Sequence, residues 1–412
     1  MNLCIVFKIY SFKSQFELRT FDPEGIIFFG DIGGEHNWFI LALRKHYLEI
    51  QFPNYLSQTA VTGGPFISDG EWKQISIANL NSTIIVTVNK EEVIRNHQPM
   101  KNEDVEGKGV LRIGIGAMFP NSSLKLTISI ANLNSTIIVT VNKEEVVRNH
   151  QPMKNEDVEG KGVLRIGIGA MFPNSSLKLT LNPPLDGCLR NWDWVRQETP
   201  ILNRLIESSE SQRCWKSVVP GSYFPGYGAA QFESHLFIDN LSMKETENWS
   251  LTVELSLRPV VANGILFAIL DLKNNLSFSI ALNDTQQAFT LTFAGKDLGS
   301  LRFPPELCSG EFQVQQLILA NKQLVFKSLE DEVIWNVADD FEALQAVWDQ
   351  PGTTVYLGGL PDWDPAAVNS YYHGCMRVKI QGTRVDVDTA KNKYSGIRSH
   401  SCPADLQLGV GK

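Results

Sequence analysis

The sequence lacks the features of several protein classes. No stretch of 18 or more consecutive apolar residues occurs in its 412 residues, so no membrane-spanning helix is predicted. The 37 Lys and Arg residues are outnumbered by 45 Asp and Glu residues, and no Lys/Arg run occurs. Because nucleic-acid binding requires clustered cations, that role is excluded. A content of 43% apolar and 20% charged residues indicates a folded chain and excludes disorder as its main state.

Motifs of catalysis are also absent. Neither G-x-S-x-G nor H-E-x-x-H occurs, and the seven histidines belong to no partner motif. Gly114-Ile115-Gly116 lacks the third glycine of a dinucleotide-binding loop and lies within a strand pattern. The sequence therefore predicts a protein that binds and does no chemistry.

The six cysteines form no C-x-x-C pair, so a structural zinc site is not expected. Cys188 and Cys214 are 26 residues apart, and Cys375 and Cys402 are 27 apart, each pair near the end of one half of the chain. This similarity predicts one disulfide in each half, with free buried thiols as the alternative. Two further cysteines are left unassigned, free or paired with each other: Cys4 and Cys308.

Glycosylation acceptors favour an extracellular protein. The N-x-[ST] pattern occurs at eight positions: Asn81, Asn121, Asn134, Asn174, Asn240, Asn248, Asn275 and Asn283. Together with the paired cysteines they predict secretion. The apolar run within residues 1–8 is too short for a signal peptide, so we expect that the signal peptide is missing from this sequence.

A tandem duplication is the most specific internal feature. Residues 75–127 recur at 128–180, and the only difference is Ile94, which becomes Val147. Repeat architectures require about three or more units, so two nearly identical copies indicate a recent duplication. A single β-sandwich has one place for each of these strands. We therefore predict that one copy, or a mixture of the two, lies outside the sandwich.

The strand patterns predict an all-β protein. Residues 251–257 alternate apolar and polar side chains, and similar runs recur every 8–12 residues between Gly, Asn, Asp and Pro turns, which is typical of antiparallel β-sandwiches. Helices are expected only at residues 201–207 and 339–348. Dense Pro and Gly at 219–228 divide the chain. The predicted domains are 1–217 and 218–405, followed by a tail at 406–412.

Several segments resemble one family. Residues 21–31 are similar to the early hairpin of laminin G-like domains, and residues 185–190 match their closing motif. The scheme recurs in the second half, at residues 356–361, 373–376 and 399–403. The pair resembles the tandem of the sex hormone-binding globulin and protein S family. The resemblance implies two laminin G-like antiparallel β-sandwiches of the jelly-roll type.

The resemblance also implies a steroid site in the first domain. A steroid needs an apolar slot with a hydrogen-bonding group at each end. The corresponding positions are Ser14, Asn37, Phe39, Asn54 and, in the two repeat copies, Leu111 and Leu164. Asn37 replaces the family's Asp; it keeps a donor and an acceptor but loses the charge. The residues alone are also explained without a ligand: Ser14 as a surface strand serine, Phe39 as a core residue and Asn54 as a turn residue.

Further expectations follow from the resemblance. A structural calcium ion would be held by Asp22 and Glu24 with main-chain carbonyls of Asn54 and Pro184, although a turn with solvated acids explains the same residues. The family's zinc site is not expected, because Asn37 and Tyr55 replace its ligands. The expected function is a secreted plasma carrier of androgens and estrogens, active as a homodimer. The alternative is a protein S-type ligand of a receptor or coagulation partner.

Overall fold

The computed structural model divides the chain into two compact units, Met1–Ser208 (domain 1) and Ser209–Lys412 (domain 2). The predicted boundary lay nine residues later, after residue 217, where strand β14 (Val218–Pro220) begins. The structure describes residues 11–31, 38–54, 57–80, 83–97, 128–133, 136–141, 144–150, 165–168, 185–194, 214–238, 249–304, 307–329, 331–360, 371–394 and 396–405.

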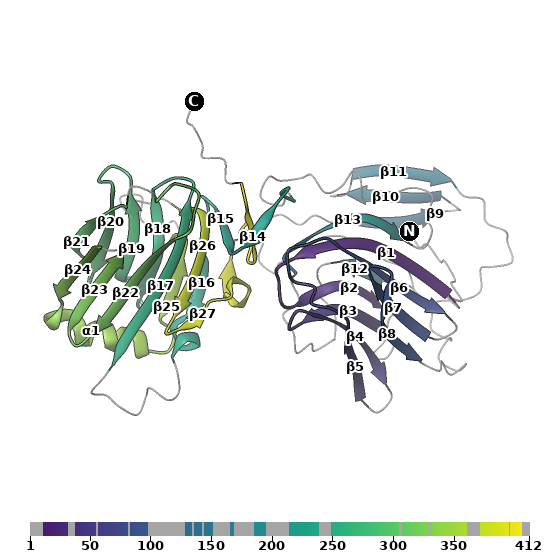
Figure 1. The fold of residues 1–412 in the computed structure, drawn as a ribbon, viewed down its shortest axis with the longest axis horizontal. Helices are drawn as coiled ribbons and strands as arrows, with labels where there is room; N and C mark the ends of the chain where they lie inside the picture. Colours follow the sequence, from purple (N-terminus) through teal and green to yellow (C-terminus); the bar gives the residue numbers. More distant parts are fainter. Residues whose placement is uncertain are drawn as a thin grey trace. The chain divides into compact units, whose positions relative to one another are not determined.

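Domain 1 contains two five-stranded antiparallel sheets (Figure 1). The first, called the β1 sheet, has the order β13 (Gly187–Trp194), β1 (Ser11–Thr20), β6 (Lys73–Leu80), β7 (Thr83–Val88) and β8 (Glu91–His97). The second, called the β2 sheet, has the order β12 (Arg165–Ile168), β2 (Gly25–Asp31), β3 (Trp38–Arg44), β4 (Tyr47–Asn54) and β5 (Ser57–Gly63). Phe16 and Leu18 of the first sheet share one core with Leu41 and Leu43 of the second, so the sheets pack face to face.

The duplicated segment is divided between these sheets. The first copy supplies β6, β7 and β8 to the β1 sheet, and the second copy supplies β12 to the β2 sheet. The intervening strands β9 (Ile128–Leu133), β10 (Thr136–Val141) and β11 (Glu144–His150) form a separate three-stranded sheet. The sequence predicted that one copy, or a mixture of the two, lies outside the sandwich; among the described strands, β9, β10 and β11 of the second copy belong to neither five-stranded sheet.

Domain 2 repeats the two-sheet arrangement. Its first sheet, the β17 sheet, has the order β15 (Ser222–Pro225), β26 (His373–Ile380), β17 (Ser250–Pro259), β22 (Gln313–Ala320), β23 (Gln323–Ser328) and β24 (Asp331–Asn336), with β27 (Thr383–Arg384) paired to β26. Its second, the β18 sheet, has the order β21 (Lys296–Arg302), β20 (Ala288–Phe293), β19 (Leu276–Asn283), β18 (Gly264–Leu270), β25 (Thr354–Leu357), β16 (Ala230–Glu233) and β28 (Asn392–Lys393).

Strand order matches between the domains. The order β13-β1-β6-β7-β8 corresponds to β26-β17-β22-β23-β24, and β12-β2-β3-β4-β5 corresponds to β25-β18-β19-β20-β21. In domain 2, β24 is followed by helix α1 (Ala338–Asp349) and then by β25, with no strand between them. Strands β9, β10 and β11 therefore have no counterpart in domain 2, which identifies them as the surplus part of the duplication.

Helix α1 confirms the helix predicted at residues 339–348. Phe341, Leu344 and Trp348 are buried along one face of the helix, and two aspartates occupy its first turn, where the helix dipole favours negative charge. The segment 201–207 lies outside the described residues. The described part of domain 2 also contains two short 3-10 helices, η3 (Ser234–Phe237) and η6 (Val387–Thr389), and the strand pair of β14 with β29 (Ser401–Pro403). Among the described residues, no helix could cross a membrane.

Candidate ligand-binding site

Ser14 lies in the interior of domain 1. It is on β1, opposite Ile77 of β6, and on the same strand face as Phe16 and Leu18, which belong to the core. Its side chain is fully buried, and its Oγ has no hydrogen-bond partner in the described structure. Because nearly all buried hydroxyls in native proteins are paired, the Ser14 hydroxyl is available to bond a group from outside the protein chain.

The other predicted steroid contacts are only partly located. Phe39 lies on β3 opposite Gly30, two positions before Leu41, a core residue. Asn54 is the last residue of β4 and pairs with Ser57 at the turn into β5. Three further positions lie outside the described residues: Asn37, Leu111 and Leu164. Ser14 is thus the one predicted contact whose side chain the structure describes, and it is not a surface residue.

Asp22 is a buried carboxylate with a structural role. Its Oδ1 accepts a hydrogen bond from the main-chain N–H of Glu24 at 3.0 Å, and its Oδ2 accepts one from the N–H of Asp186 at 2.8 Å. The Thr20 hydroxyl donates to the Asp186 carbonyl oxygen at 2.5 Å. These bonds join the end of β1 to the start of β13 across 164 residues of sequence.

The residues around Asp22 are compatible with the expected calcium ion but do not require it. Asp22 offers two carboxylate oxygens, and Glu24 adds a partly exposed carboxylate whose oxygen lies 3.9 Å from Arg44. Pro184 and Tyr55 lie outside the described residues, and the side chain of Asn54 is not described. The two N–H bonds to Asp22 hold the local turn.

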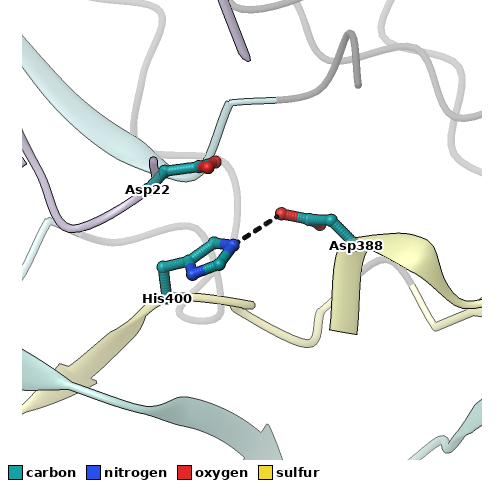
Figure 2. Close-up of side chains that lie close together, drawn as sticks. All are labelled: Asp22, Asp388 and His400. Carbon is teal, nitrogen blue, oxygen red and sulfur yellow. Dashed lines mark ion pairs between the residues drawn. The ribbon is translucent and has the colours of Figure 1, made fainter. Parts of the chain in front are cut away.

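Domain 2 contains a cluster of buried charges that the sequence did not reveal. The Asp388 carboxylate accepts hydrogen bonds from Lys393 Nζ and Ser399 Oγ, both at 2.5 Å. His400 Nε2 lies 3.2 Å from both the Asp388 and the Asp386 carboxylates, and Figure 2 shows its approach to Asp388. Burial raises the pKa of Asp388, but the bonds from His400 and Lys393 outweigh it and hold the pKa well below the usual range. The cluster ties η6, β28 and the approach to β29 together.

Four of the five described cysteines are disulfide-bonded. A disulfide joins Cys375 and Cys402, the pair indicated by the sequence. Cys188 and Cys214 are both disulfide-bonded. Cys308 is free and partly exposed, and burial raises the pKa of its thiol. Cys4 lies outside the described residues.

Two glycosylation acceptors lie in the described structure. Asn275 is exposed in the β18–β19 loop, and its Nδ2 donates to Asp271 Oδ2 at 2.9 Å. Asn283 ends β19 half-buried, and its Oδ1 accepts from Thr285 Oγ1 at 2.7 Å. The other six lie outside the described residues: Asn81, Asn121, Asn134, Asn174, Asn240 and Asn248.

Known proteins share this arrangement. Residues 18–117 match the model of the Laminin G domain family. Vitamin K-dependent protein S of Oryctolagus cuniculus is 29% identical over 96% of this chain, which spans only 54% of that protein. Sex hormone-binding globulin of Crocuta crocuta is 27% identical over 97% of this chain and 84% of the globulin. The solved domains LG4-5 of the mouse laminin alpha1 chain cover 98% of this chain and 90% of their own, with a TM-score of 0.55 at 16% identity.

These likenesses, with the two matching sandwiches, identify an all-β protein built from laminin G-like domains in tandem. More particularly, the chain is similar to both sex hormone-binding globulin and protein S, the resemblance that the sequence motifs predicted.

Proposed function

We propose that the protein is a secreted carrier that binds a sex steroid within domain 1. The observation that supports this most directly is Ser14, a fully buried hydroxyl without a partner on the inner face of β1. A steroid ketone can accept a hydrogen bond from this hydroxyl, while the ring system lies against the apolar core. The hydroxyl would then no longer be unpaired. The globulin's name describes the binding of a sex hormone, which agrees with this ligand class.

The expected affinity is physically reasonable. A nanomolar Kd corresponds to about −12.3 kcal/mol. For a C19 steroid of about 21 heavy atoms this is about 0.6 kcal/mol per atom, between the ~0.3 typical of drug-sized ligands and the ~1.5 of the best small ones. Equilibrium binding of this kind needs no catalytic group, so the proposed function is not enzymatic. The remaining proposed contacts are Phe39, Asn37 and Asn54, with Leu111 or Leu164 as an apolar wall.

Equilibrium binding of tritiated dihydrotestosterone and estradiol to the full chain tests the proposal. Saturable binding in the nanomolar range that Ser14→Ala weakens would support a carrier. A folded protein that binds neither steroid would refute it. If binding is absent in the native chain and restored by Asn37→Asp, the amide at that position is the cause. Gel filtration with and without steroid tests the proposed homodimer.

A second candidate function is a protein ligand of the protein S type. Its supporting observation is the 29% identity to protein S, of which this chain spans about half. In that case both domains would present outer surfaces to a receptor or coagulation partner, and the interior of domain 1 would hold no steroid. The steroid-binding assay separates the two functions. In either case the disulfides and the exposed sequon at Asn275 favour secretion.

A further inference from the structure

The interior of domain 2 contains two neighbouring polar side chains without partners. Gln315 of β22 is fully buried, and Ser328 of β23 is 2% exposed. In the described structure, Gln315 Oε1 and Nε2 and Ser328 Oγ all lack a hydrogen-bond partner. The two residues lie directly opposite each other in the β22–β23 pairing.

Both side chains face the core. Gln315 is in phase with Leu317 and Leu319 along β22, and those leucines belong to the domain 2 core. On its other side Gln315 lies opposite Leu255 of β17, another core residue. Three unpaired polar atoms are thus enclosed by apolar side chains. Each such group left without a partner would lower the folding equilibrium constant by roughly tenfold.

Domain 1 shows that the fold does not demand polar residues here. In the matching strands, Phe16, Ile75 and Val88 lie opposite one another in the order β1, β6 and β7. All three are buried and belong to the domain 1 core. Domain 2 replaces the Ile75–Val88 pair with Gln315 and Ser328 at the same register. Since an apolar pair fits this place, the polar pair needs an occupant to offset its cost.

We propose that Gln315 and Ser328 form an internal binding site for a hydroxyl group in domain 2. A hydroxyl both donates and accepts, so it can donate to Gln315 Oε1 while it accepts from Gln315 Nε2 or Ser328 Oγ. The hydroxyl belongs either to an ordered water or to the end of an apolar small molecule. Buried waters typically make about three hydrogen bonds, which matches the three unpaired atoms.

The sign of the stability change in single substitutions distinguishes an occupied site from an empty one. If a hydroxyl bridges the two side chains, Gln315→Leu and Ser328→Ala each lower the folding equilibrium constant by about tenfold, because each leaves the other partner unsatisfied. The double variant Gln315→Ile/Ser328→Val, which reproduces domain 1, then loses less than the two single effects combined. Gln316→Ala, one position along β22, is the matched control and leaves stability unchanged. Higher stability in both single variants would overturn the proposal.

A crystal structure of the full chain identifies the source of the hydroxyl. One isolated density peak within hydrogen-bond distance of Gln315 and Ser328 supports water. Elongated density there, with a hydroxylated apolar compound extracted by organic solvent at about one equivalent and detected by mass spectrometry, supports a bound molecule. Absence of density beside both side chains contradicts the proposal. Because the site lies in domain 2, these results do not depend on steroid binding in domain 1.

Discussion

Replacing Ser14 with alanine should have opposite effects on stability and on ligand affinity. The Ser14 hydroxyl is fully buried and has no hydrogen-bond partner among the protein's own described groups. An unsatisfied buried hydroxyl costs about 1–3 kcal/mol, so Ser14→Ala should raise the free energy of unfolding by up to that amount. A bound steroid ketone would accept a hydrogen bond from the Ser14 hydroxyl and so remove the same cost. Ser14→Ala cannot donate this bond, so it should weaken binding by about 1–3 kcal/mol, or about 5- to 150-fold in Kd.

Two measurements on the same samples test this pair of effects. Urea unfolding without ligand gives the free energy of unfolding, and titration with tritiated dihydrotestosterone gives Kd. Ser76 provides the matched control, because it lies on β6 in the same sheet and its Oγ is hydrogen-bonded to Thr87 Oγ1 at 2.7 Å. Ser76→Ala should lower stability by about 1 kcal/mol and leave Kd unchanged. A Ser14→Ala protein that is less stable than the native chain and binds steroid equally well would refute the reasoning.

Three further predictions concern the repeat, the charge cluster and calcium. Deletion of residues 98–150 removes one repeat length, including β9, β10 and β11. Both five-stranded sheets of domain 1 should remain, and the thermal midpoint should stay unchanged or rise. A fall in the thermal midpoint would show that the three-stranded sheet contributes to stability. Asp388→Asn should cost about 3–5 kcal/mol at pH 7, because it removes the buried carboxylate that accepts the hydrogen bond of the Lys393 ammonium. Since its folded pKa is lowered, the stabilisation is present above about pH 4 and is lost as pH falls toward the lowered pKa, which unfolding curves from pH 7 to 3 would show. Calcium should raise the thermal midpoint of the native chain but not that of Glu24→Gln, and equal responses of the two proteins would exclude Glu24 as a calcium ligand. Asp22→Ala should lower the free energy of unfolding by about 1–3 kcal/mol even in calcium-free buffer, because it removes the carboxylate that accepts two N–H bonds.

Strand periodicity predicted much of the fold because it reflects local burial. The alternation at residues 251–257 became β17, whose inward residues are buried in turn, and the apolar spacing at 339–348 became α1. The same periodicity contains the two unpaired sites. Ser14 is in phase with Phe16, and Gln315 is in phase with Leu317. A polar residue in phase with a buried stripe was therefore a readable signal at both places.

The Asp388 cluster could not be predicted in the same way. Its members come from η6, from β28 and from the segment before β29, and their spacing in the sequence carries no periodic signal. Likewise, the bond between Asp22 and the N–H of Asp186 joins residues 164 positions apart. Such contacts depend on how the strands are ordered in the sheets.

The duplication separates the two kinds of information most clearly. The two copies form the same three-stranded meander with the same irregularity, between Val86 and Thr87 in one and between Val139 and Thr140 in the other, because hairpin pairing depends on nearby residues. The sequence alone determined that meander. Only the tertiary structure decided that the first copy pairs with β1 and that the second supplies β12. Each sheet has one position beside β1 or β2 for a strand of the repeat, and the two nearly identical copies fit that position equally well.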